Sequence, residues 1–377
     1  MTSQPLVSVV MPVWNDARWL GEAIDSILGQ TLHELELIVV DDGSTDETPA
    51  ILEAYAARES RVRVLRVTHG GTARALNHGL DASTAEFVAN LDSDDWSHPD
   101  RLSLQVRFLR DHPELVMVGC DVDKIDEHGC ITGAAARPPT DAAIRFKTLL
   151  WAPFTQSATT ARRQHLVAHG LRYDESLRGS EDYEFWTRLL DTGRCANLPE
   201  RLVRYRVRQG MSTRHRSEFV TIAVSIARRT IERWIPGFET DEKEVRALRS
   251  AFGGMGRVSI SDDAEGHGLA RRYLELFEAF ALAHAGDPDV EALARFEASR
   301  FLSAFRPRLD DAGWLELVAR LHRLDPGFPR RYLARWAPRL RREALRDTGR
   351  ALLDGPRRWQ RRRKTPQGQP PDTGSRS

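Results

Sequence analysis

Residues 35–46 read LELIVVDDGSTD, an apolar run that stops at two aspartates and a glycine. Its first six residues are rich in apolar and β-branched side chains, which is typical of a buried strand. Gly43 permits a sharp turn, and Asp46 can cap a helix that we expect over residues 47–58. The stretch therefore predicts a strand that leads through an acidic turn into a helix.

The same order is repeated along the first half of the chain. Residues 7–13, VSVVMPV, predict a strand, and Asn15 and Asp16 are candidate N-caps of the helix that follows. Strands that alternate with helices predict an α/β fold whose sheet is mostly parallel and covered on both faces. The further strands are expected at 62–67, 87–91 and 115–119, with a helix at 72–80.

A second acidic cluster, Asp92-Ser-Asp94-Asp95, follows the strand expected at 87–91. Ligands of open α/β sheets bind beyond the carboxyl ends of the strands, where both acidic clusters are expected. Three carboxylates within four residues repel one another unless a proton or a cation offsets the repulsion. An EF-hand counted from Asp92 would need Gly and Glu where the chain has Ser97 and Ser103, so a calcium loop of this type is excluded.

Each acidic cluster has a structural and a functional interpretation. The first is explained by turn geometry alone, and the second by a solvated loop ahead of a helix. Alternatively, the second cluster holds a hard divalent ion through one or two carboxylates, and substrate phosphates and water complete the coordination. That arrangement is typical of Mg²⁺ or Mn²⁺, and it indicates a phosphorylated ligand.

The composition is that of a globular protein. The chain has 377 residues, of which 41% are hydrophobic and 29% charged, so bulk disorder and collagen-like repeats are excluded. It contains no run of about 18 uncharged apolar residues, and its first residues lack the basic and apolar segments of a secretory signal. We therefore expect a cytoplasmic protein that does not span a membrane.

Several short segments together resemble the nucleotide-binding half of the family 2 glycosyltransferases, which have the GT-A fold. They are VSVVMPVWN (7–15), DDGSTD (41–46), ARALN (73–77) and DSDD (92–95), followed by GLRYDE (170–175), SEDYEFW (180–186) and YRVR (205–208). The ordered set spans roughly residues 5–213. The resemblance implies inverting, metal-dependent transfer of a sugar from a nucleotide-diphosphate donor, with a UDP-sugar as the expected donor.

The resemblance assigns the nucleotide end of the donor to four residues. It implies contacts of Pro12, Trp14 and Asp42 with the base and ribose, and it places Arg74 near the base. A carboxylate can accept the imide hydrogen of uracil, and an indole can pack against a flat base. Trp14 could instead cover the first helix, and Arg74 could pair with a surface carboxylate.

The diphosphate end of the donor is assigned to the second acidic cluster. Asp92 and Asp94 resemble the DxD pair of the family. Asp94 is implied as a direct ligand of Mn²⁺ or Mg²⁺, and Asp92 is implied at the ribose or the metal. Arg208 stands where many relatives place a His that meets the diphosphate, and its guanidinium can also bind phosphate.

For the acceptor, the resemblance makes Asp182 the catalytic base and Glu181 a residue that orients the acceptor. A carboxylate base of this kind contributes about 10² to 10⁴ in rate. The other interpretation is structural, with Ser180 as an N-cap and the two carboxylates at the positive end of the helix dipole. Gln156 stands where relatives often carry a His beside the acceptor pocket.

Three parts are predicted along the chain. Residues 1–235 form the GT-A catalytic domain, residues 236–338 a helical C-terminal region, and residues 339–377 a basic, partly disordered tail. The tail holds 12 Lys and Arg against 4 Asp and Glu, whereas the whole chain has a net charge of +1. The tail is either solvated or a peripheral anchor on anionic lipid at the inner face of a membrane.

The expected partners are a nucleotide-sugar donor and a saccharide or lipid-linked saccharide acceptor in surface glycan biosynthesis. No nucleic acid is expected, because the chain has no recognisable nucleic-acid module. A sugar nucleotidyltransferase would need a glycine-rich phosphate loop near the first strand, and VMPVWN (10–15) contains no glycine. A glycoside hydrolase would need two carboxylates that face the scissile bond, which does not explain acidic residues at a nucleotide-like crevice. A catalytically inactive nucleotide-sugar-binding or scaffold protein remains the alternative.

Overall fold

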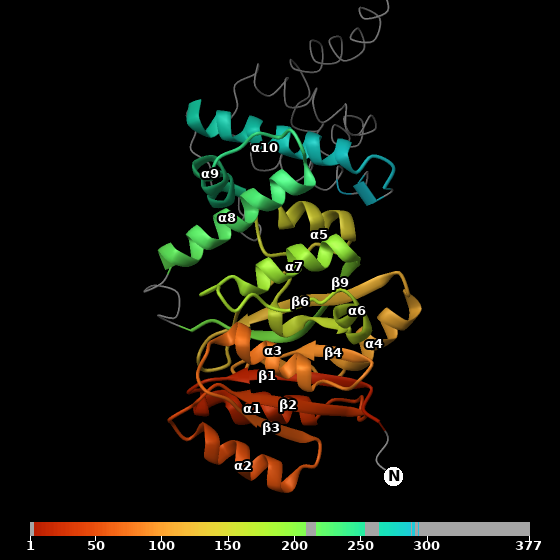
Figure 1. The fold of residues 1–377 in the computed structure, drawn as a ribbon, viewed down its shortest axis with the longest axis vertical. Coiled ribbons are helices and arrows are strands. Elements are labelled where there is room, and N and C mark those ends of the chain that lie inside the picture. The colour runs from red at the N-terminus through yellow and green to blue at the C-terminus, as the bar shows by residue number, and fades with distance from the viewer. Residues whose placement is uncertain (1–3, 209–215, 253–263, 288, 291–292, 294–377) are drawn as a thin grey trace, which may run out of the picture. The chain divides into compact units, whose positions relative to one another are not determined.

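The structure of the chain is a computed structural model, and Figure 1 shows its ribbon. It describes residues 4–208, 216–252, 264–287, 289–290 and 293. Of these, the described residues in 4–252 and 268–290 belong to one compact unit. The predicted tail at 339–377 and most of the predicted helical region at 236–338 lie outside the described residues, and the boundary at residue 235 stays a prediction.

In the described part of the chain, nine strands form one mixed sheet. The order is β3-β2-β1-β4-β8-β6-β9-β5, with β7 paired to β6. The first four strands in this order are parallel, as are β6 and β9, whereas β5, β7 and β8 pair antiparallel. The bounds are β1 Val7–Val13, β2 Leu35–Asp41, β3 Val62–Arg66, β4 Phe87–Asn90, β5 Trp96–Ser97, β6 Leu115–Ile125, β7 Ile131–Ala135, β8 Thr160–Arg162 and β9 Arg194–Arg206.

Helices cover both faces of this sheet, so the α/β fold predicted from the sequence is confirmed. Along β1, Val9 and Met11 pack in the same cluster as Leu20 and Ile24 of α1, whereas Val10 packs with α3 and α7 on the other face. The helices are α1 Ala17–Leu28, α2 Thr48–Arg58, α3 Thr72–Ala82, α4 Arg101–Asp111, α5 Asp141–Thr148, α6 Arg163–Ala168, α7 Glu181–Thr192, α8 Arg216–Trp234, α9 Glu242–Phe252 and α10 Ala264–Ala283, with a 3-10 turn at Gln156–Ala158.

The register of the parallel strands brings their carboxyl ends to one edge. Val13 of β1 pairs with Asp41 of β2, and Val10 of β1 pairs with Asn90 of β4. The loops that follow these three strands therefore meet, and they contain both predicted acidic clusters. Strand β9 was not predicted, and its pairing with β5 brings the segment ending in Arg206 to the same edge.

An aromatic cluster joins the later helices to the rest of the unit. Phe146 of α5 contacts the rings of Tyr273, Phe277 and Phe280 of α10, at centroid distances of 5.6, 4.9 and 5.3 Å. The apolar face of α10 is therefore part of the buried core. Within the described residues, no helix combines the length and the hydrophobicity that crossing a membrane requires.

Candidate active site

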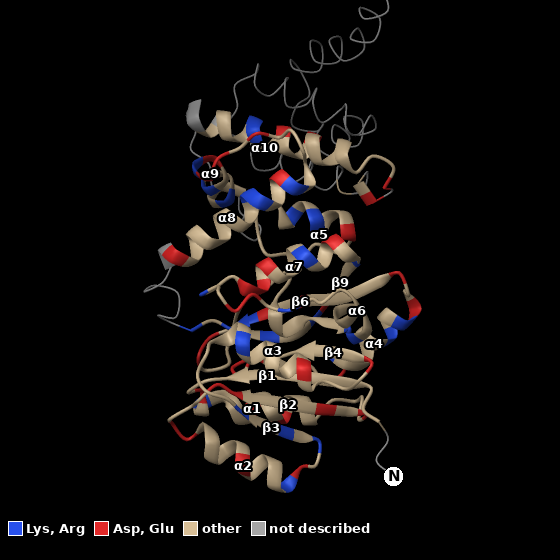
Figure 2. Cartoon of the chain, viewed as in Figure 1, with Lys and Arg blue, Asp and Glu red and all other residues tan. Residues whose placement is uncertain are grey.

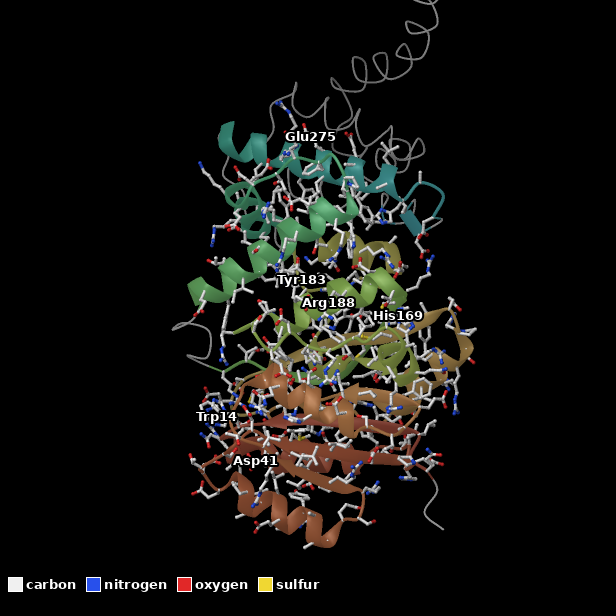
Figure 3. All side chains as sticks on the ribbon, in the orientation of Figure 1. Trp14, Asp41, His169, Tyr183, Arg188 and Glu275 are labelled. Atoms are coloured by element: carbon white, nitrogen blue, oxygen red, sulfur yellow. The ribbon has the colours of Figure 1, made fainter. Side chains whose placement is uncertain are left out.

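The candidate site lies at the carboxyl edge of the parallel strands. Figure 3 labels Trp14, which follows β1, and Asp41, which ends β2, on the same side of the sheet. Figure 2 shows in red the acidic residues at the start of α7. The site is thus built from the loops after β1, β2 and β4, the start of α7 and the end of β9.

Hydrogen bonds tie the loop after β1 to the acidic turn after β2. Asn15 has a positive φ of 48°, and its Oδ1 accepts bonds from the backbone N–H of Thr45 (2.8 Å) and Asp46 (3.3 Å). Asp46 Oδ1 accepts a bond from the N–H of Thr48, the first residue of α2, but the N-cap position is held by Glu47, whose side chain makes no capping bond, so the predicted cap is displaced by one residue. The left-handed backbone at Asn15 costs free energy, and these bonds compensate for it. These hydrogen bonds consequently join the two loops, which together form one side of the site.

The predicted donor residues Trp14, Asp42 and Arg74 converge on the turn at residues 69–71. The carboxylate of Asp42 is 4% exposed and accepts bonds of 2.8 Å from the N–H of Gly70 and of Gly71. Arg74 lies along the same turn, since a Cβ on Gly70 would stand 2.4 Å from its Cδ. Asp42 therefore fixes the backbone of this turn.

An aromatic pair that sequence reasoning missed includes His69, the first residue of this turn. The indole of Trp14 is stacked on the imidazole of His69 at 4.5 Å between centroids and 22° between planes. His69 Nδ1 lies 2.9 Å from Asp42 Oδ2. Trp14 is 53% exposed, so its ring lies at the open edge of the site. Pro12 is half-buried in β1, opposite Val40 of β2.

Three aspartates follow β4 as a compact acidic centre. Burial raises the pKa of Asp92 to about 7, and repulsion by Asp94 adds to the shift. The same two causes raise the pKa of Asp95 well above its usual range, and burial raises the pKa of Asp94. Asp95 Oδ1 accepts from the N–H of Arg206 at 2.7 Å, whereas its buried Oδ2 has no partner among the described residues.

The acidic centre fits a divalent cation. In the described part of the chain, no group of three or more His, Cys, Asp and Glu side chains is arranged to hold a metal. Mg²⁺ is nevertheless usually bound by only one or two protein carboxylates, while phosphates and water supply its other oxygen ligands. Asp92 and Asp94 could supply two such carboxylates. The buried Oδ2 of Asp95, which has no hydrogen-bond partner among the described residues, is a further oxygen of this centre that a ligand could satisfy.

Arg208 supplies part of that compensation. Its Nε lies 2.6 Å from Asp94 Oδ2, and its Nη2 lies 2.6 Å from Asp16 Oδ2. The guanidinium also stacks over the indole of Trp19 at 4.3 Å. Asp16 stands at the predicted N-cap position of α1, but its side chain makes no capping bond and accepts instead from Arg208 and from Ser93 Oγ (2.6 Å).

The turn before α7 places Glu181 and Asp182 opposite the acidic centre. Ser180 has φ 59° and forms no side-chain capping bond, so capping by Ser180 does not explain this sequence. Gly179 has φ 124°, and a Cβ there would stand 2.3 Å from the ring of Phe219. This strained turn therefore requires glycine, and it fixes where the two carboxylates begin.

The carboxyl group of Asp182 has a raised pKa. Burial first and the neighbouring Glu181 second raise its pKa to about 7, whereas Arg137 opposes the shift. Burial also raises the pKa of Glu181, and repulsion by Asp92 contributes. The field of Asp182 in turn acts on Asp92, so the start of α7 and the acidic centre belong to one site.

Two further residues lie beside Asp182: Arg137 carried no sequence signal, and Tyr173 belongs to the GLRYDE segment but was assigned no role. Arg137 follows β7, its N–H donates to Asp121 Oδ1 at 2.7 Å, and its guanidinium donates to Thr155 Oγ1. The hydroxyl of Tyr173 accepts a bond of 2.6 Å from Gln156 Nε2, and burial raises the pKa of this tyrosine. Gln156 thus anchors Tyr173 at the site.

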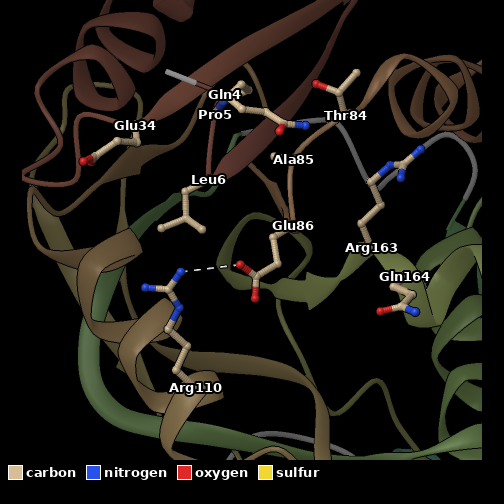
Figure 4. A pocket seen from close by; sticks show the side chains of 10 residues that line it. All are labelled: Gln4, Pro5, Leu6, Glu34, Thr84, Ala85, Glu86, Arg110, Arg163 and Gln164. Atoms are coloured by element: carbon tan, nitrogen blue, oxygen red, sulfur yellow. Dashed lines mark hydrogen bonds and ion pairs between the residues drawn. The ribbon is translucent and has the colours of Figure 1, made fainter. Parts of the chain in front are cut away.

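A separate cavity of about 810 Å³ opens at the amino ends of β1 and β4 (Figure 4). Its lining includes the half-exposed ion pair of Arg110 and Glu86 at 3.4 Å. It lies at the opposite edge of the sheet from the acidic centre, whereas ligands of such sheets bind at the carboxyl edge. The cavity therefore has no part in the candidate site.

Comparisons with known proteins agree with this geometry. The model of the family described as Glycosyl transferase family 2 matches residues 8–169. EpsE of Bacillus subtilis (strain 168), which is named as a glycosyltransferase, is 37% identical over 224 residues, 58% of this chain and 78% of EpsE. The amylovoran biosynthesis glycosyltransferase AmsE of Erwinia amylovora is 30% identical over 218 residues, 56% of this chain and 80% of AmsE.

The fold is also similar to that of solved structures. S. aureus TarS 1-349, in complex with UDP-GlcNAc, superposes with a TM-score of 0.51 at 18% sequence identity. The match covers 86% of this chain and 91% of the TarS chain, and it concerns the fold alone. Together with the sequence relatives, it identifies the chain as a member of glycosyl transferase family 2 and a glycosyltransferase with the GT-A fold.

Proposed function

We propose that the chain transfers a sugar, with inversion at the anomeric carbon, from a nucleotide-diphosphate donor to a hydroxyl of a saccharide. The observation that carries the proposal is the placement of Asp182, whose pKa is about 7, in one electrostatic site with Asp92. A general base works best when its pKa lies near the operating pH. The acidic centre of Asp92, Asp94 and Asp95, with a divalent cation bound, would suit the negatively charged diphosphate of a donor.

The transfer balances as a single displacement. The acceptor oxygen attacks the anomeric carbon while its proton passes to the carboxylate of Asp182. The bond from that carbon to the phosphate oxygen breaks, and its electron pair stays on the departing nucleoside diphosphate. Glu181 precedes Asp182 at the start of α7, where it can orient the acceptor.

The leaving group requires compensation of its growing negative charge. Asp92 and Asp94 would hold Mn²⁺ or Mg²⁺, and such a cation, when bound, stabilises the departing diphosphate without a proton donor. Arg208 contributes a permanent positive charge beside the same aspartates. No second carboxylic acid is needed to protonate the leaving oxygen.

The nucleotide would bind at the turn of residues 69–71. The Trp14 indole, stacked on His69, offers a flat surface for a base, and Arg74 offers a cation beside it. Asp42 positions the turn through Gly70 and Gly71. We propose a uridine-based donor, and the bases of the other nucleotides are the alternatives that the experiment below distinguishes.

The acceptor is proposed from the relatives. AmsE is named for amylovoran biosynthesis, and a further relative, 26% identical, is named chondroitin synthase. We therefore propose a growing surface polysaccharide or a lipid-linked saccharide as the acceptor. Contact with anionic lipid through residues 339–377 at the cytoplasmic face of a membrane is part of this proposal, and removal of those residues should weaken vesicle binding but spare transfer to a soluble acceptor.

The first experiment is thermal unfolding of the full chain with UDP, GDP, TDP and CDP, each with and without Mn²⁺. A ligand at about 100 times its Kd stabilises the folded state by about 2.7 kcal/mol, which is readily measured. We expect a shift with UDP and Mn²⁺ that is lost in Asp94→Asn. No shift with any nucleotide would contradict the proposal and favour a scaffold protein.

A second variant separates binding from chemistry. Asp182→Asn keeps the shape of the base but removes its proton affinity, so the nucleotide shift should persist while transfer falls by about 10² to 10⁴. Glu184→Gln, on the same helix but paired to Arg188 at 2.7 Å, is the matched control and should transfer normally. Full activity of Asp182→Asn would refute its role as the base.

A further inference from the structure

Arg208 is held in the site by three groups from different parts of the chain. They are Asp16 after β1, Trp19 in α1 and Asp94 after β4. The Arg208 side chain is only 20% exposed, and the Asp16 and Asp94 side chains are 5% and 11% exposed. Ser93 Oγ donates to the same oxygen of Asp16 at 2.6 Å and holds it toward the guanidinium. The guanidinium is therefore held in a mostly buried position by several groups, unlike the cation of an exposed surface ion pair.

The arginine pairs with one of the two carboxylate oxygens of Asp94. Nε of Arg208 stands 2.6 Å from Asp94 Oδ2, an ion pair whose N–H is not aligned for a hydrogen bond, and Asp94 is the carboxylate proposed as the direct metal ligand. A guanidinium and a divalent cation cannot both approach one oxygen at bonding distance without strong repulsion. A cation that binds Asp94 through this oxygen therefore has to displace Arg208.

We propose that Arg208 is an internal counter-cation that occupies Asp94 in the donor-free protein and competes with the divalent metal for it. The proposal rests on the proposed function, because it concerns the metal of that reaction. Asp16 is the positioning residue that keeps Arg208 in place. A diphosphate that arrives with the metal offers the released guanidinium a new anionic partner, so the protein takes up metal and donor together rather than metal alone.

The test measures binding of Mn²⁺ alone to the full chain, by the electron paramagnetic resonance signal of the free ion. Removal of the charge in Arg208→Gln should lower the Kd for Mn²⁺ at least about tenfold, which corresponds to about 1.4 kcal/mol. Arg208→Lys should fall between the wild type and Gln, because an ammonium on a single stem cannot bridge two carboxylates as the guanidinium fork does.

A matched control lies on β9, the strand that ends two residues before Arg208. Arg204 is exposed, and its guanidinium stacks over Trp96 at 4.3 Å, so Arg204→Gln removes an arginine of β9 without freeing Asp94. Its Kd for Mn²⁺ should equal that of the wild type. Thermal unfolding gives a second readout, in which Mn²⁺ alone should raise the Tm of Arg208→Gln but leave that of the wild type nearly unchanged.

Either of two results would overturn the proposal. One is a Kd of Arg208→Gln equal to or weaker than that of the wild type, which would make Arg208 neutral or helpful to the metal. The other is an equal decrease of the Kd for Mn²⁺ in Arg204→Gln, which would mean that the loss of one positive charge from the protein explains the effect. If the Mn²⁺ test fails while UDP still shifts the Tm, the competition between Arg208 and the metal is refuted and the proposed transferase function stands. If Arg208→Gln binds Mn²⁺ more tightly but no nucleotide shifts the Tm, the competition stands and the proposed transferase function is refuted.

Discussion

Asp182 owes its raised pKa to burial first and to the carboxylate of Glu181 second. Because the base must be deprotonated to accept the acceptor proton, kcat/KM should rise about tenfold per pH unit below pH 7 and level off above it. The measurement is a pH profile of kcat/KM with the donor found in the nucleotide screen. A flat profile between pH 5.5 and 7.5 would contradict the assignment of the base.

Glu181 provides a control for the cause of that shift. Glu181→Gln removes a negative charge beside Asp182 and leaves its burial unchanged, so the pKa of Asp182 should fall and the acidic limb should move to lower pH. Glu184→Gln, three residues further along α7 than Glu181 and paired to Arg188, should leave the profile in place. An unmoved limb in Glu181→Gln would mean that Glu181 does not face the base.

Sequence reasoning identified the residues of the site better than their partners. Asp42, Asp94 and Asp182 were predicted as site residues because each stands in a local motif, and their roles stay predictions. The contacts of Asp42 with Gly70 and of Asp16 with Arg208 join residues 28 and 192 positions apart. Asp16 looked like a helix cap because a cap is a local signal, whereas its ion pair depends on where β9 returns to the sheet.

At the level of elements, the close approach of α3 to β1 gives a prediction about stability. A Cβ on Gly79 of α3 would stand 2.2 Å from Val10 Cγ1 in the buried core. Gly79→Ala should therefore destabilise the protein by about 1 to 3 kcal/mol, the usual cost of overpacking, despite the better helix propensity of alanine. Chemical denaturation measures the change.

A glycine in another helix is the matched control. Gly21 of α1 would place its Cβ 3.5 Å from the hydroxyl of Tyr55, which is an ordinary contact. Gly21→Ala should thus stabilise the protein by up to about 1 kcal/mol through helix propensity. Val10→Ala should partly rescue Gly79→Ala by removing the methyl that clashes, and equal effects of both glycine substitutions would contradict the packing argument.

The elements that the sequence predicted are those with a simple pattern. The apolar runs of β1, β2, β3 and β4 and the helices between them follow their expected bounds closely. Strand β9 has 13 residues in which buried and exposed positions follow no strict alternation, and its register with β6 shifts several times. Strands β5 and β8 have two and three residues, too few for a periodic signal.

At the level of the whole molecule, the acidic site should govern the response of stability to pH. The pKa values of Asp92 and Asp182 rise from 3.8 to about 7 on folding, so the native state binds more protons than the unfolded chain between these values. The stabilising contribution of the protonated groups is present below pH 4. It is lost as the pH rises through about 7.

The metal-free protein should therefore lose stability from pH 5 to pH 7, by at most about 1.4 kcal/mol per pH unit for each group. Urea denaturation in the presence of a chelator measures this slope. Asp182→Asn removes one of the two groups and should flatten the slope, whereas Asp81→Asn, whose exposed carboxylate pairs with Arg172, should not. Stability that rises with pH over this range would show that the two carboxylates are fully compensated by their neighbours in the folded protein.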